Sequence, residues 1–302
     1  MKNDIMKSGK PFVKWVGGKS QLLSQYDELL PGDLSRCKNL TYVEPFVGGG
    51  AMLFHMLQKF PNIRRVVIND INKDLIATYC VIKERPKELI TRLEKLQKHF
   101  RSCKDEDERR CLFQKMRSRY NSRRCCQLET ASLFIFLNRT GFNGLYRVNS
   151  EGRYNVSFGK CTNPLICDVE TIYADSKLLQ KVDIQTGDYV KTFDSLKGEV
   201  FAYLDPPYRP LTITANFTGY SKEGFGDDEQ RRLALFCREM NNKGFRWLTS
   251  NSDPHNVNVD DDFFDELYAG FDIHRVLARR MVNSDASGRG KITELVIRNY
   301  FE

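Results

Sequence analysis

The 302-residue sequence lacks several features that would place it in a common class of protein. No apolar run approaches the roughly 20 residues that span a bilayer, and residues 1–10 lack the apolar core of a signal peptide. Only four histidines are present, and none of the nine cysteines forms a C-x-x-C pair, so no metal site is expected. These absences predict a cytoplasmic protein without a membrane partner, whose thiols are reduced and mostly buried.

Glycine is absent and proline occurs only once between Asp74 and Leu137. Apolar residues recur there at steps of three and four, so the stretch is expected to be mainly helical. It is also basic, because residues 83–124 hold 15 Lys/Arg against 7 Asp/Glu, a surplus equal to the net charge of +8 of the whole chain. Such a run is often only a solvated helix face, but charge this concentrated favours a polyanion, with nucleic acid as the leading candidate.

Outside this stretch, apolar runs that predict strands alternate with amphipathic runs that predict helices, which indicates the α/β class. Strands are predicted at residues 41–44, 65–70, 182–187, 199–204 and 245–250, with 271–277 and 293–300 paired as the closing strands. Helices are predicted at residues 20–30, 51–59, 73–81, 228–243 and 263–270.

The tetrapeptide Asp205-Pro206-Pro207-Tyr208 follows the predicted strand 199–204. It therefore lies at the carboxyl end of a strand, where open α/β sheets bind their ligands. The two prolines fix the backbone and remove two N–H donors, so the carbonyls are expected to face outward as acceptors. A carboxylate, a carbonyl and an aromatic ring together suit a planar amino group on an aromatic ring. The alternative is a rigid turn that only ends the strand.

Two glycine-containing turns are candidates for ligand contact. Gly17-Gly18-Lys19 precedes a predicted helix but lacks the spacing of a Walker loop, and Trp15 beside it is either a core residue or a ligand platform. Glu44 ends a strand, and Gly48 to Gly50 lead into helix 51–59, which is the general shape of a nucleotide pocket. A plain strand–turn–helix connection is the alternative, because the G-x-G-x-x-G spacing is absent.

Two further acidic residues follow predicted strands. Asp70 lies 20 residues after Gly50, where a carboxylate can accept both ribose hydroxyls, although Asn72 nearby also suits a simple helix cap. Asp188 follows strand 182–187 and could accept a hydrogen bond from an adenine amino group.

Residues 138–160 carry Asn-Gly and Glu-Gly turn signals between Tyr, Val and Phe, which predicts a β-hairpin. Its Arg side chains can donate two hydrogen bonds to guanine, its Asn side chains can form hydrogen bonds with adenine, and its aromatic rings can stack on bases or insert between them. A polar hairpin surface is the alternative, but the composition favours contact with nucleic acid.

Taken together, these motifs resemble the Dam-type (D12 class, α group) DNA adenine-N6 methyltransferases, over nearly the whole chain and in the family's order. The segments that carry the resemblance are residues 14–19, 44–50, 69–72, 138–159, 187–189, 205–208, 217–220 with Phe225, and 294–300. The resemblance implies a Rossmann-like S-adenosylmethionine-dependent methyltransferase sheet formed by residues 1–74 and 165–302. A mainly helical DNA-recognition domain, residues 75–164, would be inserted in it and would carry the hairpin.

The resemblance also implies roles for individual residues. The implied catalytic residues are Asp205, Pro206, Pro207 and Tyr208. The implied cofactor contacts are Trp15, Lys19, Glu44, Pro45, Phe46, Gly48, Gly50, Asp70, Ile71, Asp188, Tyr189 and Asp205. The implied DNA contacts are Arg123, Arg124, Asn138, Arg139, Phe142, Asn143, Leu145, Arg147, Asn155, Ser157, Lys160 and Tyr220, and no metal is implied.

The implied reaction is methylation of N6 of a flipped-out adenine in double-stranded DNA, within GATC, with S-adenosylmethionine as donor. Arg147 falls where the family reads guanine, and Phe142 and Asn143 fall where side chains enter the site left by the adenine. Ser157 and Lys160 depart from the usual Pro and Arg, which leaves the outer bases of the target open. We expect a monomer or weak dimer, with a cognate restriction endonuclease as a candidate partner. Cytosine-N4 or RNA-base methylation, or a non-catalytic DNA-binding protein, are the alternatives.

Overall fold

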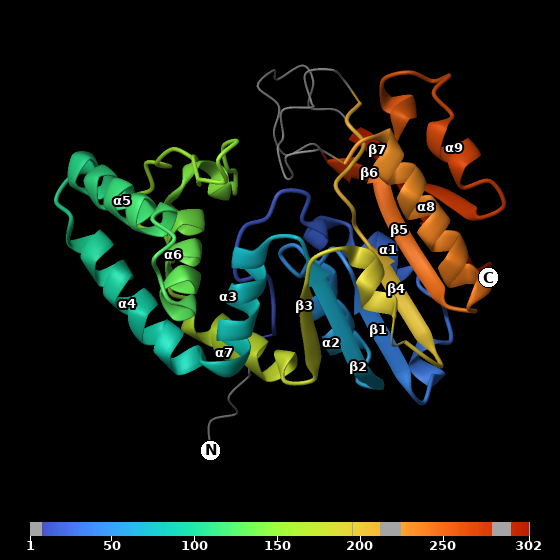
Figure 1. Cartoon of the computed structure of the whole chain (residues 1–302), viewed down its shortest axis with the longest axis horizontal. Helices are drawn as coiled ribbons and strands as arrows, with labels where there is room; N and C mark the ends of the chain where they lie inside the picture. The colour runs from blue at the N-terminus through green and yellow to red at the C-terminus, as the bar shows by residue number, and fades with distance from the viewer. Residues whose placement is uncertain (1–7, 195, 212–224, 280–290, 302) are drawn as a thin grey trace. The chain divides into compact units, whose positions relative to one another are not determined.

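The computed structural model describes residues 8–194, 196–211, 225–279 and 291–301. Seven strands form one sheet in the order β3 (Val182–Thr186), β2 (Ile63–Asp70), β1 (Leu40–Glu44), β4 (Val200–Leu204), β5 (Arg246–Ser252), β7 (Lys291–Arg298) and β6 (Asp272–Arg279) (Figure 1). β1, β4 and β5 run parallel, and β7 pairs antiparallel with both β5 and β6. This sheet confirms the predicted Rossmann-like α/β class and the pairing of the two closing strands.

Every residue of β1 and of β4 is buried. Strands of a parallel sheet are covered on both faces, so they read as continuous apolar runs rather than as alternating patterns. That is why the run 199–204 predicted a strand so closely, and why the polar residues that follow it stand at the carboxyl edge of the sheet.

The chain divides into two compact units, residues 1–18, 47–61 and 68–189 in the first and residues 19–46, 62–67 and 190–302 in the second. The first unit contains α2 (Ala51–Lys59), α3 (Lys73–Glu84), α4 (Pro86–Ser102), α5 (Glu106–Asn121), α6 (Gln127–Thr140) and α7 (Val169–Leu179). The second contains α1 (Leu23–Asp27), α8 (Asp227–Asn242) and α9 (Phe263–Leu267). The boundaries expected for an inserted recognition domain stay a prediction.

Local sequence signals account for most helix starts in the first unit. The Asn72 side chain accepts from the backbone N–H groups of residues 74 and 75 and so caps α3. Pro86 occupies the first turn of α4, where its missing N–H costs nothing, and Asp105 caps α5. The predicted helix 20–30 is shorter than expected, since only α1 and the 3₁₀ turn Lys19–Gln21 form there.

Helix α6 is the centre of the helical part of the first unit. It packs against α3, α4 and α5, and ten of its residues are buried. The rings of Phe100, Phe113, Phe136 and Phe158 meet beside it, with the ring centroids of Phe113 and Phe158 5.6 Å apart. Because the middle of α6 is enclosed on several sides, residues 131–137 are apolar except for Ser132 rather than amphipathic.

The expectation that the thiols are mostly buried is wrong. All nine cysteines are free, but only Cys37, Cys167 and Cys237 are buried, and Cys111 and Cys126 are exposed. Cys111 lies on the outer side of α5 and Cys126 at the start of α6, where no neighbouring element covers them. Within the four described ranges, no helix combines the length and the apolar character needed to cross a membrane.

Candidate active site and DNA-binding surface

The turn Asp205–Tyr208 directly follows β4, as the sequence predicts. Asp205 is half-buried, and its Oδ1 atom accepts a hydrogen bond from Ser250 Oγ at 2.8 Å. The Tyr208 hydroxyl donates to Glu294 Oε2 at 2.6 Å. The Pro207 carbonyl does not face outward as expected, because it accepts from Gln230 Nε2 at 3.1 Å. The turn is thus held by β5, β7 and α8.

Lys19 lies beside this turn. Its side chain is buried, and its Nζ atom is 2.9 Å from Asp205 Oδ1 and 4.6 Å from the centroid of the Tyr208 ring. The ammonium group therefore contacts a carboxylate and an aromatic face at once. Such pairing offsets the cost of keeping a carboxylate charged in a partly buried position.

Glu44 ends β1 and is buried, and its Oε2 atom accepts from the Tyr42 hydroxyl at 2.7 Å. Burial raises the pKa of Glu44 well above its usual value, and the negative charge of Asp205 acts in the same direction. Two residues further on, the ring of Phe46 meets the ring of Phe225 edge-on at 5.9 Å. Pro45, between Glu44 and Phe46 in the chain, is also buried.

In the first unit, Trp15 packs on the second glycine turn. A Cβ atom added to Gly48 would lie 2.8 Å from Trp15 Cδ1, and one added to Gly49 would lie 2.9 Å from Trp15 Cβ. Gly48 and Gly50 also have positive φ angles of 47° and 78°, which favour glycine. The Trp15 ring also stacks with the ring of Tyr146, and the two ring centroids are 5.9 Å apart. Glycine is needed in this turn for close packing of an indole.

Asp70 ties this glycine turn to the end of β2. Its Oδ2 atom accepts from the Gly48 backbone N–H at 3.0 Å, and its Oδ1 atom accepts from the Asn72 N–H at 2.8 Å. Burial raises the pKa of Asp70 to about 6, although these backbone hydrogen bonds act in the opposite direction. Asn72, not Asp70, caps α3. Ile71 is 64% exposed.

The segment after β3 lies beside the end of β2. The Gly187 carbonyl accepts from Asn69 Nδ2 at 3.0 Å, and the Gly187 N–H donates to the Asp70 carbonyl at 3.3 Å. Asp188, which is half-buried, and Tyr189, which is buried, directly follow the glycine that these bonds tie to the end of β2. Within the first unit, Asp70 and Asp188, the two acidic residues that follow predicted strands, therefore belong to segments joined by hydrogen bonds.

Residues 141–159, called the turn segment below, double back on themselves without forming a regular β-hairpin. Two isolated antiparallel bridges join Gly141 to Phe158 and Val148 to Tyr154. The expected near strand is replaced at its start by the 3₁₀ turn Phe142–Gly144, in which Asn143 has a φ of 53°. The predicted hairpin is right in that the chain returns antiparallel to itself, but wrong in that no regular strands form. Residues with a left-handed backbone conformation, such as Asn143, interrupt the ladder of hydrogen bonds.

The tips of this segment carry the side chains expected to contact DNA. Phe142, Asn143, Arg147, Ser157 and Lys160 are exposed, whereas Leu145 and Asn155 are half-buried. The Arg147 Nε atom donates to Asn155 Oδ1 at 2.9 Å, which orients the guanidinium group. Lys160 lies 3.8 Å from a carboxylate oxygen of Glu106.

Two residues expected to contact DNA serve the interior of the first unit. The buried Asn138 side chain donates to the carbonyls of Lys14 and Gly144 and accepts from the Lys14 N–H, all within 2.8 Å. Arg139 donates to the Phe12 carbonyl at 2.7 Å. Both lie on α6 rather than in residues 141–159, and their contact with DNA stays a prediction. Tyr220 and the rest of the expected target-base loop, residues 217–220, lie outside the described residues.

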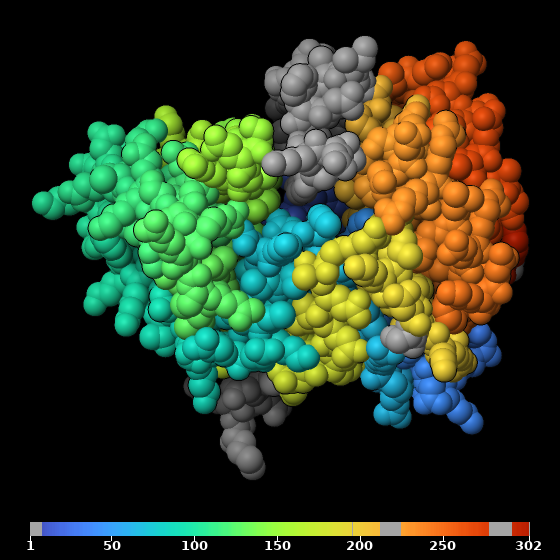
Figure 2. All heavy atoms as spheres, in the orientation of Figure 1, coloured from blue at the N-terminus to red at the C-terminus, as the bar shows by residue number. Residues whose placement is uncertain are grey.

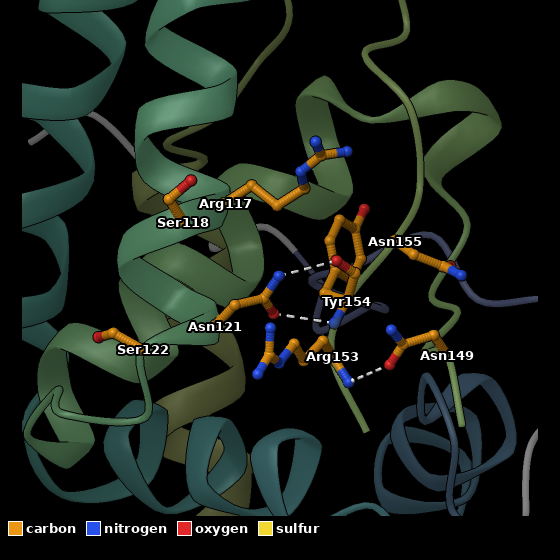
Figure 3. Close-up of a pocket in the computed structure, with 8 residues that line it drawn as sticks. All are labelled: Arg117, Ser118, Asn121, Ser122, Asn149, Arg153, Tyr154 and Asn155. Atoms are coloured by element: carbon orange, nitrogen blue, oxygen red, sulfur yellow. Dashed lines mark hydrogen bonds between the residues drawn. The ribbon is translucent and has the colours of Figure 1, made fainter. Parts of the chain in front are cut away.

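An open pocket of about 600 Å³ between α5 and the turn segment was not singled out by the sequence (Figure 3). Asn121 bridges its two walls, because its amide donates to the Tyr154 carbonyl at 2.9 Å and accepts from the Tyr154 N–H at 2.8 Å. The lining residues are Arg117, Ser118, Asn121, Ser122, Asn149, Arg153, Tyr154 and Asn155. The spacing of Arg117 and Asn121, four residues apart on one helix face, is the signal that could have revealed it.

The basic run is divided between ion pairs and open surface. Arg119 pairs with Glu129 at 2.8 Å, and Arg123 pairs with Asp74 at 2.6 Å and also donates to the Gly152 carbonyl. Arg124 is exposed, and Figure 2 shows many projecting side chains on α4 and α5. The exposed basic residues of α4 are Lys87, Arg92, Lys95, Lys98 and Arg101. Part of the basic run therefore forms ion pairs and part is open to solvent, and its contact with nucleic acid stays a prediction.

Among the residues that the structure describes, one group has the ligand types of a metal site, namely His255, Asp262 and Asp265. The Arg275 guanidinium donates to both oxygens of Asp265 and contacts His255 Nδ1 at 3.1 Å. A cation already fills this position, so we assign no metal to it.

Comparison with known proteins gives this geometry its context. The model of the D12 class N6 adenine-specific DNA methyltransferase family matches residues 15–282. Type II methyltransferase M.MjaIII of Methanocaldococcus jannaschii is 45% identical over 294 residues, which cover 96% of this chain and 99% of that protein. Type II methyltransferase M1.LlaDCHI of Lactococcus lactis subsp. cremoris is 36% identical over 297 residues, covering 96% and 95%.

The DNA adenine methylase of Escherichia coli K12 is 31% identical over 291 residues, covering 96% of this chain and 95% of that protein. The family match and these relatives extend over both compact units and include the turn after β4. The carboxylate and aromatic ring at that turn, together with matches of this extent, show that the chain belongs to the D12 class of N6 adenine-specific DNA methyltransferases.

Proposed function

We propose that the chain transfers a methyl group from S-adenosylmethionine to N6 of an adenine flipped out of duplex DNA, within GATC. The observation that carries the proposal is the position of Lys19 Nζ, 2.9 Å from Asp205 Oδ1 and 4.6 Å from the centre of the Tyr208 ring. One nitrogen that bears hydrogens can thus contact the carboxylate and the aromatic face together. An aromatic amine needs the same two partners, a hydrogen-bond acceptor for its N–H and a face for its ring.

Adenine N6 is a weak nucleophile, because its lone pair is delocalised into the ring. In the proposed reaction, the Asp205 carboxylate and the Pro206 carbonyl accept hydrogen bonds from its two N–H groups and so localise the lone pair on nitrogen. Tyr208 stacks on the base, which must first leave the helix. S-adenosylmethionine would supply an electrophilic methyl group. Its sulfonium–methyl bond would break as the bond to N6 forms, it would leave as the thioether S-adenosylhomocysteine, and N6 would then release one proton to solvent. The protein's contribution is then positioning and fixed charge, without a separate strong base.

The residues around Asp70 fit the adenosyl part of this cofactor. Asp70 Oδ2 accepts from the Gly48 N–H and Oδ1 accepts from the Asn72 N–H, and a carboxylate has further lone pairs that can accept from ribose hydroxyls. With a pKa of about 6, the carboxyl is mostly ionised at neutral pH and can accept both. We propose Asp188 as the acceptor for the adenine amino group of the cofactor. The other cofactor contacts implied by the resemblance stay predictions.

We propose that DNA binds the exposed tips of residues 141–159, with Arg147 reading guanine and Phe142 and Asn143 filling the space left by the adenine. Arg147 is exposed and oriented by Asn155, which supports this role. The pocket lined by Arg117 and Arg153 suits a backbone phosphate, because both side chains carry a positive charge. Contacts of this kind position the duplex without reading its sequence.

The test uses the full chain, labelled S-adenosylmethionine and duplexes that contain GATC or a scrambled site. Nucleoside mass spectrometry should find N6-methyladenine in the GATC duplex alone. Asp205→Ala should abolish transfer and leave the dissociation constant for DNA within about threefold. Label in cytosine N4 or in RNA would support the alternative substrates, and no label in any nucleic acid would support a non-catalytic DNA-binding protein.

Partners are proposed on the same basis. Two of the relatives are named type II methyltransferases, so we propose that a cognate restriction endonuclease cleaves the same sequence. We propose that the methyltransferase itself acts as a monomer or weak dimer. Light scattering at several concentrations, with and without a GATC duplex, tests the oligomeric state.

A further inference from the structure

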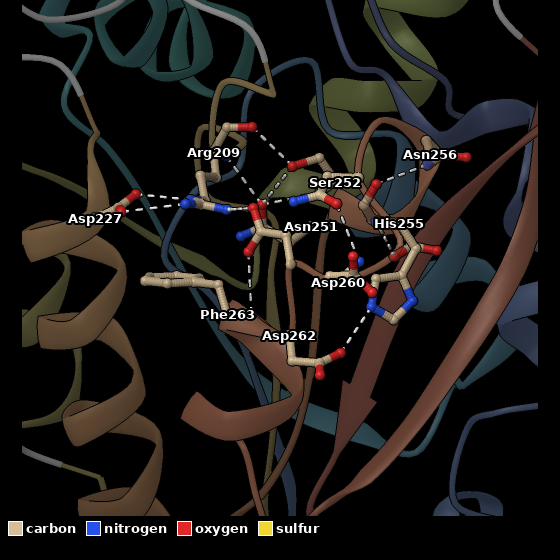
Figure 4. Close-up of polar contacts among 12 residues, drawn as sticks. Arg209, Asp227, Asn251, Ser252, His255, Asn256, Asp260, Asp262 and Phe263 are labelled. Atoms are coloured by element: carbon tan, nitrogen blue, oxygen red, sulfur yellow. Dashed lines mark hydrogen bonds and ion pairs between the residues drawn. The ribbon is translucent and has the colours of Figure 1, made fainter.

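Arg209 directly follows the Asp205–Tyr208 turn and has a dense set of contacts. Its Nε atom donates to Asp227 Oδ1 at 2.8 Å and its Nη1 atom donates to Asp261 Oδ2 at 2.7 Å. The guanidinium carbon lies 4.3 Å from the centroid of the Phe263 ring. Two carboxylates from separate segments and one aromatic face therefore hold a single side chain (Figure 4).

The backbone of Arg209 is also held. Its N–H donates to Asn251 Oδ1 at 3.1 Å, and its carbonyl accepts from Ser252 Oγ at 2.8 Å. Asn251 Nδ2 donates in turn to Gln230 Oε1 at 2.9 Å, and Gln230 Nε2 reaches the Pro207 carbonyl. Asn251 and Gln230 are buried, so this amide pair is a rigid link between Pro207 and Arg209.

The turn needs such supports because of its own sequence. Strand β4 ends at Leu204, and Pro206 and Pro207 have no N–H to continue a ladder of backbone hydrogen bonds. The Arg209 N–H, two residues after the second proline, donates to Asn251 Oδ1 and so ties the chain to β5. The guanidinium group fixes the chain where it leaves the turn, one residue after Tyr208.

A guanidinium group suits this task better than an ammonium group. Its planar fork bonds Asp227 through two nitrogens, at 2.8 Å and 3.3 Å, while a third nitrogen bonds Asp261. The Arg209 side chain is 18% exposed, against 46% for Asp227 and 30% for Asp261. A lysine could reach one of the carboxylates but could not join both in the same plane.

We propose that Arg209 is a positioning residue for methyl transfer, which fixes the exit of the Asp205–Tyr208 turn against Asp227 and Asp261 and so sets the placement of the Asp205 carboxylate and the Tyr208 ring. The inference rests on the proposed function, since it assigns those two groups to the target adenine. Arg209 itself does not touch the adenine. Its loss should affect the rate of the chemical step more than binding.

The test compares Arg209→Ala and Arg209→Lys with Arg275→Ala as a matched control. Arg275 also joins two carboxylates, Asp253 and Asp265, but it lies on β6 and does not contact the turn. For Arg209→Ala we expect kcat to fall by about 100-fold, because a shift of about 1 Å in reacting groups has an effect of that order. KM for both substrates should stay within about threefold, and Arg209→Lys should recover part of the rate.

Further measurements separate positioning from general stability. The melting temperature of each variant and the fluorescence of 2-aminopurine at the target position report folding and base placement without turnover. Arg275→Ala should lower the melting temperature and leave kcat near the wild-type value. Asp261→Asn should reduce kcat less than Arg209→Ala, and the double variant should be no slower than Arg209→Ala alone, since the two groups act through one contact.

Three results would overturn the inference. The first is a kcat for Arg209→Ala within about threefold of wild type. The second is a rise in KM that accounts for the whole loss of kcat/KM in Arg209→Ala, and the third is an equal loss of kcat in Arg275→Ala. If Arg209→Ala does not fold, Arg209→Lys and Asp261→Asn decide by the same criteria. Absence of transfer by the wild-type chain would refute the proposed function instead, and the two failures are therefore distinct.

Discussion

Replacing Asp70 with asparagine should change how the stability of the protein depends on pH. In the wild type, Asp70 accepts N–H groups from Gly48 and Asn72, yet burial raises its pKa to about 6. In the unfolded chain an aspartate has a pKa of about 3.9. The folded state therefore binds this proton more tightly than the unfolded state does.

The sign of the effect follows from that difference. The stabilisation from protonated Asp70 is present in full below the unfolded pKa and is lost as pH rises through about 6. A difference of about two pKa units corresponds to roughly 3 kcal/mol, and we expect about 2 kcal/mol because Asp70 is only half-buried. The Asp70→Asn variant does not titrate at this position. Its free energy of unfolding relative to wild type should rise by about 2 kcal/mol between about pH 4 and pH 7.

Guanidinium unfolding curves of both proteins, recorded by tryptophan fluorescence at unit steps of pH, measure this difference. Other titrating groups are common to the two proteins and cancel. The reasoning about burial is refuted if the difference between the variant and the wild type is independent of pH, or if it rises toward acid. The absolute offset between them also contains the loss of one acceptor, because the two N–H groups bond different oxygens of Asp70 and asparagine has an NH₂ group in place of one of them.

Two further predictions concern the glycine turn and the DNA contact. Gly48→Ala combines a positive φ with a Cβ atom 2.8 Å from Trp15 Cδ1, so we expect it to lower the free energy of unfolding by more than Gly152→Ala. Gly152 has a similar φ of 74° but no neighbour within 4 Å, so equal losses in the two variants would show that the indole contact contributes nothing. Arg147→Ala should weaken binding to a GATC duplex by about 1–3 kcal/mol and relax discrimination at one base pair, as measured by competition with single-base variants of the site. Uniform weakening across all those variants would instead indicate a phosphate contact.

The parts of the fold that the sequence predicted well are those with strong local patterns. The apolar run before Asp205 corresponds to β4, and the predicted helix 51–59 matches α2 at both ends. Each pattern reflects burial of the segment itself, so neighbours far along the chain were not needed to recognise it. The predicted helix 20–30 and the regular hairpin failed where short segments and left-handed residues depend on tertiary contacts.

Polar side chains were harder to assign. Asn138 and Asn143 are both amides near the same turn, yet one is buried and bonded to Lys14 while the other is exposed. Nothing in the local pattern distinguishes an amide that satisfies backbone groups from one that is open to a base. The same holds for Arg209, whose partners Asp227 and Asp261 lie far along the chain.

The sequence by itself determined the α/β class, the order of the motifs and the position of the turn Asp205–Tyr208, because each depends on residue types at short, fixed spacings. The tertiary structure alone decided that Lys19 meets Asp205 and Tyr208, that Asp70 binds the glycine turn, and which polar groups remain exposed. Hydrogen-bond partners and burial arise from segments brought together by folding. The same side chain is therefore a ligand contact or an internal support according to which distant backbone it meets.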